Sequence, residues 1–558
     1  MASRSTSVLT IAGVTLLTGF VAYALYFDYK RRNNVEFRKN LRKQKKRVDK
    51  SIASSQASEA AASAVSQAEL RQALEQVKKE PVPASPDQKE AYFMSQVGAG
   101  EQLSLQGPDF HLPAAMSFYR ALRVYPSPVE LMVIYQKTVP EPIFKLVIEL
   151  TNLDVKDRVE GYYDHFPPKS LGVEVGTRPN PSNGTLRKVL VLSKDVKAGE
   201  VIYKERPIVG VLDFDIQAAG THCSHCMRAI EPSQGIKVPS DPLSSVYCST
   251  DCHSAAKSQS HSLLFSLERP LPEEIPTEPV TPDQLEARRK VQTQYVDYIK
   301  KTGKAGPLLV GRFIARQVAL ETSKLIPGTS PVKNAKNDFV DADGGDYLLA
   351  DHLERLRFLE LQPPKEEVEL ITEVLKSVLP GLESFVTDER YAVLLGKMAY
   401  NAFGVSYDGG RDDKPATDAR PEDLERTRTP VGTSRQIGTA IYTVASYLSH
   451  SCDPNARPSF TGTSELQLIA NKDLKKGDEL TVSFVDCTMH EGESVQDARR
   501  RRRMELARGW RFACGCEKCI EEAKELGLES GDAKSEAKDE SKVEQAYSNY
   551  EKNEATTL

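Results

Sequence analysis

The segment Ala513-Cys514-Gly515-Cys516-Glu517-Lys518-Cys519 places three cysteines within one short turn near the C-terminus. A fourth cysteine, Cys452, lies upstream in Ser449-His450-Ser451-Cys452-Asp453-Pro454-Asn455. A zinc ion takes four tetrahedral Cys or His ligands, and short cysteine turns supply two or three of them without strain. Cys452, Cys514, Cys516 and Cys519 are therefore predicted to form one zinc site.

A second set of cysteines has similar spacing. Its members are Cys223, Cys226, Cys248 and Cys252, which predict a second zinc site. Disulfide bonds are the alternative, but nothing in the sequence reads as a secretory signal with a cleavage site. The ninth cysteine, Cys487, stands apart and is expected to be an ordinary half-buried thiol. We therefore expect two zinc ions.

The 558 residues suffice for three or four domains, and the net charge of −4 does not indicate direct binding to nucleic acid. Residues 5–27 carry no charge and would span about 34 Å as a helix, enough for a bilayer core. Basic residues follow from Lys30 onward, which predicts a single-pass anchor with the bulk of the chain in the cytosol. A cleavable signal peptide is the alternative, but its charges would precede the apolar core, where only Arg4 lies.

Residues 28–88 are first basic and then polar, as in a solvated stalk. Apolar residues then recur at helical spacing, beginning with Phe93 and Val97, and Pro128 marks the start of a further helix. Residues 89–170 are thus predicted to form short helices that resemble a tetratricopeptide-type hairpin with a flanking helix.

Four short motifs carry a more specific resemblance, which extends over about residues 5–170. They are Tyr26-Phe27-Asp28-Tyr29-Lys30-Arg31-Arg32-Asn33, Glu36-Phe37-Arg38, Glu90-Ala91-Tyr92-Phe93 and Ala99-Gly100-Glu101-Gln102. This part resembles the fungal twenty-kilodalton receptor of the mitochondrial outer-membrane translocase, the Tom complex. The resemblance implies an apolar groove for an amphipathic presequence helix, lined by Phe93, Met94, Val97, Leu131, Ile134 and Tyr135. For each of these residues, burial in the core is an equal alternative.

The sequence changes character after Pro179. Short β-branched runs with glycine turns occur at 189–203 and again at 466–486, which predicts small antiparallel sheets in an α+β domain. Residues between about 280 and 400 have helical patterns. The whole chain is therefore expected to be multidomain, with an all-α part followed by an α+β part.

The strands, the segment around His450 and the cysteine sets resemble the SET-and-MYND lysine methyltransferases over about residues 180–522. In that family a MYND zinc finger and a helical insert interrupt the SET fold, and a post-SET zinc segment closes it. The implied boundaries are 180–222 for the first SET part, 223–261 for the finger, 262–400 for the insert, 401–486 for the SET core and 487–522 for the post-SET segment. Residues 523–558 read as a disordered charged tail.

The same resemblance implies contacts with S-adenosylmethionine from Asn401, Ser446, Ser449, His450 and Phe512. Ordinary packing or capping roles are the alternative for these residues. The second zinc site of the MYND finger lacks its cysteine pair, although His253 and His261 remain, so one zinc is expected there.

Catalysis is the weaker part of this interpretation. Ser449 stands where the family has asparagine, and Phe484 stands where the family has a tyrosine whose hydroxyl helps to orient the substrate amine. Such a hydroxyl contributes roughly 10²–10⁴ in rate. Tyr407, Tyr442 or Tyr447 could substitute for it.

Two functions follow from these resemblances. The first is an import receptor in the mitochondrial outer membrane that binds presequence peptides and other translocase subunits, fused to a SET/MYND-like module able to bind S-adenosylmethionine. The second is an active lysine methyltransferase held at the same membrane. Two neighbouring genes joined in life or in gene prediction would produce the same sequence.

Overall fold

The computed structural model describes residues 65–527, apart from 82, 84–85, 126–127, 181–183, 232, 239, 269–279, 324–338, 340–346, 380–381, 417–419, 421–422 and 430–432. The predicted anchor at 5–27 and residues 528–558 of the predicted tail lie outside the described residues. None of the described helices is both long enough and apolar enough to cross a bilayer.

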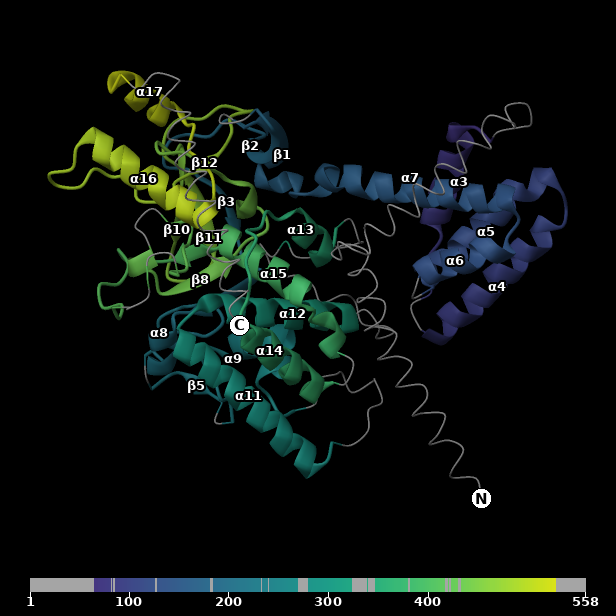
Figure 1. The fold of residues 1–558 in the computed structure, drawn as a ribbon, viewed down its shortest axis with the longest axis horizontal. Helices are drawn as coiled ribbons and strands as arrows, with labels where there is room; N and C mark the ends of the chain where they lie inside the picture. The colour runs from purple at the N-terminus through teal and green to yellow at the C-terminus, as the bar shows by residue number, and fades with distance from the viewer. Residues whose placement is uncertain are drawn as a thin grey trace, which may run out of the picture.

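The N-terminal part is helical, as predicted (Figure 1). Its helices are α3 (Gln67–Lys79), α4 (Pro86–Ser104), α5 (His111–Val124), α6 (Pro128–Thr138) and α7 (Glu141–His165). The composition assigns α3 to the polar stalk, yet Leu70, Leu74 and Val77 recur on one face of it and are buried against α5 and α7. A capping box between Ser66 and Glu69 fixes its first turn.

Helix α7 joins the two parts of the molecule (Figure 1). Its first turns bury Ile143 and Leu150 in the core of the helical part. At its other end, Tyr162 and Phe166 belong to the core of the following α+β domain. The helix ends at His165 because Pro167 disfavours helical geometry in the residue before it, and Phe166 is extended.

The α+β domain contains small sheets, as expected. Four of the sheets are antiparallel. Two are pairs, β1 (Val173–Pro179) with β2 (Leu186–Leu192) and β5 (Ile236–Lys237) with β6 (Val246–Tyr247). Two have three strands, with β11 (Leu466–Ala470) between β10 (Ala456–Phe460) and β3 (Val201–Glu205), and β8 (Gly438–Ile441) between β4 (Val209–Leu212) and β7 (Phe403–Val405). The short pair β9 (Ser449–His450) and β12 (Thr481–Val482) is parallel, which the alternating pattern does not reveal.

Strands that are far apart in the sequence lie side by side in this domain. The backbone N–H of Leu480 donates to Leu190, and that of Gly199 donates to Ala470. These bonds bring β2 and the turn before β3 against the segment before β12 and the end of β11.

The region between these strands contains a finger and a helical layer with its own core. Its helices are α8 (Phe214–Ala219), α9 (Thr250–Ala256), α10 (Ser262–Leu264), α11 (Pro282–Thr302), α12 (Ala305–Ser323), α13 (Leu349–Arg355), α14 (Lys365–Val378) and α15 (Asp388–Asn401). The chain closes with α16 (Val495–Trp510) and α17 (Glu517–Glu525), and α17 extends into the segment expected to be disordered.

Candidate functional site

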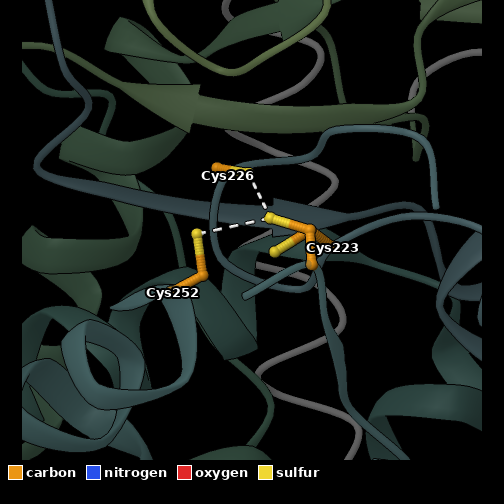
Figure 2. Close-up of side chains that lie close together, drawn as sticks. Cys223, Cys226 and Cys252 are labelled. Carbon is orange, nitrogen blue, oxygen red and sulfur yellow. Dashed lines mark hydrogen bonds between the residues drawn. The ribbon is translucent and has the colours of Figure 1, made fainter. Parts of the chain in front are cut away.

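The first cysteine set converges in space. The sulfur atoms of Cys223, Cys226, Cys248 and Cys252 all lie within 4.8 Å of one another, and Figure 2 shows three of them pointing toward a common centre. Cys226 and Cys248 have sulfurs 3.6 Å apart, as do Cys248 and Cys252. Tetrahedral Zn–S bonds of about 2.3 Å require sulfurs about 3.8 Å apart, whereas a disulfide requires about 2.05 Å. The spacing therefore fits a metal ion.

Local backbone geometry sets these sulfurs in place. The N–H of Met227 donates to the carbonyl of Cys223 (2.9 Å), and Met227 adopts a left-handed φ of 61° that turns the chain directly after Cys226. Ser249 caps α9 by accepting the N–H of Cys252 (3.2 Å).

The second set converges in the same way. The sulfur of Cys452, which follows β9, lies 3.9 Å from that of Cys514 and 3.6 Å from that of Cys519. Its backbone N–H also donates to the sulfur of Cys516 (3.4 Å). Cys487 is half-buried, as expected, but it is not isolated because it forms a further close group with His450 and Cys452.

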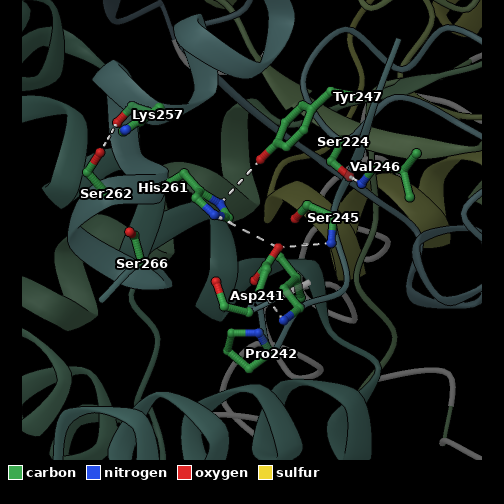
Figure 3. Close-up of polar contacts among 12 residues, drawn as sticks. Ser224, Asp241, Pro242, Ser245, Val246, Tyr247, Lys257, His261, Ser262 and Ser266 are labelled. Atoms are coloured by element: carbon green, nitrogen blue, oxygen red, sulfur yellow. Dashed lines mark hydrogen bonds and ion pairs between the residues drawn. The ribbon is translucent and has the colours of Figure 1, made fainter. Parts of the chain in front are cut away.

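A hydrogen-bonded cluster occupies the region where the MYND resemblance places a second metal site (Figure 3). The carboxylate of Asp241 accepts the backbone N–H groups of Leu243 and Ser245, both at 2.9 Å. His261, at the end of a π-helical turn (Lys257–His261), has one ring nitrogen 3.2 Å from the Tyr247 hydroxyl and the other 4.0 Å from Asp241. Burial lowers the pKa of His261. These polar contacts brace the finger where the second cysteine pair is missing.

Three of the predicted site residues meet around a residue that the sequence analysis does not identify, Arg428. Its Nη2 donates to Oδ1 of Asn401 (3.0 Å), and its Nη1 donates to the carbonyl of Ser446 (3.3 Å). Its guanidinium carbon lies 4.4 Å from the ring centre of Phe484. The amide nitrogen of Asn401 donates to the carbonyls of Arg357 and Lys397, so this side chain is engaged on both sides. Arg428 lies in a polar stretch without periodicity, and only the fold brings it to this position.

His450 connects the metal-ligand candidates to Phe484. Its Nδ1 accepts the backbone N–H of Phe484 (3.1 Å), which places the ring proton on Nε2, 3.4 Å from the sulfur of Cys452. Burial lowers the pKa of His450 to about 4, so the ring is neutral at pH 7. The ring of Phe512 lies 6.1 Å from that of His450 and 6.3 Å from that of Phe484. Phe512 thus covers this cluster.

A cavity of about 370 Å³ lies on the other side of Ser446. Ser449 contacts its wall because its hydroxyl accepts a hydrogen bond from Arg187, which also pairs with Glu479 (2.8 Å). The lining is aromatic and basic and includes Tyr163, Tyr447, Arg187, Lys188, Arg355 and Arg357. The size suits a small-molecule ligand.

Tyr163 belongs to α7, so the helical part supplies a wall of this cavity. The Nζ of Lys188 lies 4.6 Å from the ring centre of Tyr163. The aromatic run from Tyr162 to Phe166 is a sequence signal for this contact, because three large rings at the end of a predicted domain need a surface to cover them.

The three tyrosines proposed as substitutes for the missing hydroxyl differ in their surroundings. The hydroxyl of Tyr442 donates to the carbonyl of Ser464 (2.6 Å), and that of Tyr407 donates to the carbonyl of Met227 (2.9 Å). Of the three, Tyr447 is the one that lines the cavity.

The six residues predicted to line the presequence groove lie on two helices, α4 and α6. Leu131 and Tyr135 are buried in the core, and Phe93 and Val97 are half-buried. Met94 and Ile134 are 63% and 47% exposed. The described residues thus offer apolar side chains to solvent on both helices.

Comparison with known proteins agrees with this division. The MAS20 protein import receptor family matches residues 10–164, and the SET domain family matches residues 187–485. The helical part is similar to mitochondrial import receptor subunit tom20 of Neurospora crassa, with 46% identity over 28% of this chain and 83% of that protein. It is also similar to TOM20 of Saccharomyces cerevisiae, with 37% identity over 25% of this chain and 76% of that protein.

The α+β part is similar to protein-lysine N-trimethyltransferase SMYD5 of Mus musculus. The two are 27% identical in an alignment of 390 positions that covers 62% of this chain and 86% of that protein.

Proposed function

The chain belongs to the SET domain family over residues 187–485 and to the MAS20 import receptor family over residues 10–164, and from this we propose a two-part function. The N-terminal part is a receptor for mitochondrial presequences within the outer-membrane translocase. The SET part is a module that binds S-adenosylmethionine and is held together by two zinc ions. Residues 5–27 anchor the protein in the outer membrane, with both parts in the cytosol.

The 46% identity with a tom20 protein carries the receptor proposal. The exposed apolar side chains of Met94 and Ile134 on α4 and α6 support it, because an amphipathic helix buries its apolar face on such residues. The buried Leu131 and Tyr135 would shape the floor of this surface without direct exposure.

Replacing Ile134 by aspartate tests the receptor. A carboxylate beneath the apolar face of a bound presequence is left without a partner, so we expect the affinity for a fluorescent presequence peptide to fall at least tenfold. Val155→Asp, at a 38% exposed residue of α7, is the control and should leave the affinity unchanged. Equal affinities for all three proteins would remove the groove assignment.

Zinc is the metal we propose for both cysteine sets, because four thiolates at tetrahedral spacing favour it. Elemental analysis of the full chain should find two zinc ions per molecule. A third ion would contradict the interpretation of the Asp241 cluster as a replacement for the second MYND site.

The cavity fits S-adenosylmethionine in size, and its basic lining complements only the carboxylate of this cofactor, which also carries a positive sulfur and an amino group. Arg187, Lys188 and Arg357 suit its carboxylate, and Tyr163 offers an aromatic face. When bound, this cofactor supplies an electrophilic methyl group on a positively charged sulfur. Asn401 and Ser446 approach the same region from the side of Arg428. Because Phe484 has no hydroxyl, we propose that the SET part binds its ligand without robust catalysis.

A specific observation favours the second function, an active lysine methyltransferase. Tyr447 lines the cavity, and its hydroxyl, which is buried, would have to turn toward the cavity to orient a substrate amine. Calorimetric titration of S-adenosylmethionine into the zinc-loaded full chain in detergent tests the cofactor. Micromolar binding corresponds to about −8 kcal/mol and would justify a substrate search, whereas no binding would leave the SET part as a scaffold.

A further inference from the structure

Arg428 lies on the segment between β7 and β8, and its side chain is buried in an aromatic enclosure. Only 1% of the residue is exposed. Its guanidinium carbon lies 4.4 Å from the ring centre of Phe484, 5.1 Å from that of Tyr400 and 5.6 Å from that of Phe403. All three distances are within the range of cation–π attraction.

The hydrogen-bond acceptors around Arg428 are neutral. The guanidinium donates to the carbonyl of Tyr400 (3.0 Å), to the carbonyl of Ser446 and to Oδ1 of Asn401. Burial lowers the pKa of Arg428 to about 9, which leaves it charged at pH 7. A cation buried without a carboxylate is costly, so rings and oxygen dipoles must compensate for lost hydration.

The same combination recognises organic cations from outside. Aromatic faces attract alkylammonium and guanidinium groups, and oxygen atoms at hydrogen-bond distance fix their orientation. We infer that Phe484, Tyr400, Phe403 and the three oxygen acceptors form a binding site for a cationic side chain, and that Arg428 occupies it as an internal ligand. We call these residues the cage.

The cage has a consequence for the SET part. Phe484 is the residue that replaces the family tyrosine, and Asn401 and Ser446 are candidate cofactor contacts. While Arg428 occupies the cage, a lysine side chain of another protein cannot reach the face of Phe484. The cage follows from the geometry alone, and only its relevance to lysine substrates rests on the proposed function of the SET part.

A purely structural role for Arg428 is the competing explanation. In that case the guanidinium ties the C-terminal end of α15 to the turn before β9. The space left after its removal would then have no preference for cations. The two explanations therefore differ in what the emptied cage binds.

Trp510 provides the measurement. It is the one tryptophan of the chain, its ring lies 5.4 Å from that of Phe484, and its indole N–H donates to the same Tyr400 carbonyl that Arg428 contacts. Its fluorescence should therefore respond to occupancy of the cage. The protein for the titration is the full chain in detergent that carries the substitution Arg428→Ala. It is titrated with the cations n-butylammonium and methylguanidinium and, separately, with the neutral molecules 1-butanol and urea.

We expect Arg428→Ala to show a saturable fluorescence change with the cations, at least tenfold tighter than with the neutral molecules. The unaltered chain should show no saturable change. Arg435→Ala, which removes an arginine of the same segment that pairs with Asp412 at the surface, is the matched control and should behave like the unaltered chain.

A folded Arg428→Ala chain with no preference for cations would overturn the proposal. If this variant does not fold, Arg428→Gln replaces it, because glutamine keeps a donor but is shorter and neutral and leaves the cage partly open. Failure of both variants to fold would establish the structural role and also overturn the proposal. Failure of S-adenosylmethionine to bind would refute the cofactor assignment without changing this result.

Discussion

Replacing Phe166 by alanine tests whether the receptor and SET parts share one core. Phe166 follows α7 and is fully buried among aromatic rings of the SET part, with ring centres 4.6 Å away for His352, 5.3 Å for Tyr347 and 6.2 Å for Tyr447. Removal of a fully buried phenylalanine typically costs about 3–5 kcal/mol through lost burial and the remaining cavity. At about 1.4 kcal/mol per factor of ten, the unfolding equilibrium of the SET part should shift by about two to nearly four orders of magnitude.

The assay is unfolding of the zinc-loaded full chain in guanidinium chloride, followed by Trp510 fluorescence. Trp510 is buried in the same core as Phe166 and reports on the SET part. Phe358→Ala is the matched control, since Phe358 is 47% exposed and its removal should cost less than about 1 kcal/mol. If Phe166→Ala costs no more than this control, the helix does not enter the SET core in solution and the two parts are independent.

Three further outcomes are expected. Cys514→Ser should reduce the zinc content from two ions to one and unfold the segment around Trp510. The reason is that structural zinc supplies about 10–16 kcal/mol of binding free energy in small fingers. Two retained zinc ions would contradict the ligand assignment. Burial raises the pKa of Glu205 from 4.5 to about 7, so its contribution to stability is complete below about pH 4.5 and lost as the pH rises through about 7. The stability of the unaltered chain relative to Glu205→Gln should therefore fall by up to about 3 kcal/mol between these values, and a rise would contradict the sign. Asp241→Ala should destabilise the finger by about 2–4 kcal/mol in thermal unfolding, because two backbone N–H groups lose their acceptor. Both zinc ions should remain bound in this variant. Loss of a zinc ion would show that Asp241 supports a metal.

Local sequence patterns were sufficient to predict the features of this protein that depend on residues close together in the sequence. The spacing of Cys223 and Cys226, and of Cys514 and Cys519, predicted groups of sulfurs that the fold brings together. Pro128 marked the start of α6, and β11 begins at Leu466, where the predicted β-branched run begins. Each of these features depends on a turn, a cap or an alternation over a few residues.

Average composition was misleading where a polar segment has one apolar helical face. Residues 67–79 have a composition typical of a stalk, yet four of them lie on one helical face and are buried. A mean over the whole segment conceals this face, since the other nine of its 13 residues are solvated.

The sequence by itself determined the two families, their order and the eight cysteines that converge in two groups, because these depend on local motifs and their spacing. Only the tertiary structure decided that Tyr163 of α7 lines a cavity of the SET part, that Asp241 and His261 lie 4.0 Å apart in the finger, and that Arg428 lies against Phe484. The physical reason is that these contacts join residues from different elements through side-chain packing. A buried arginine and an exposed one look the same in a sequence, and only the surrounding rings and carbonyls distinguish them.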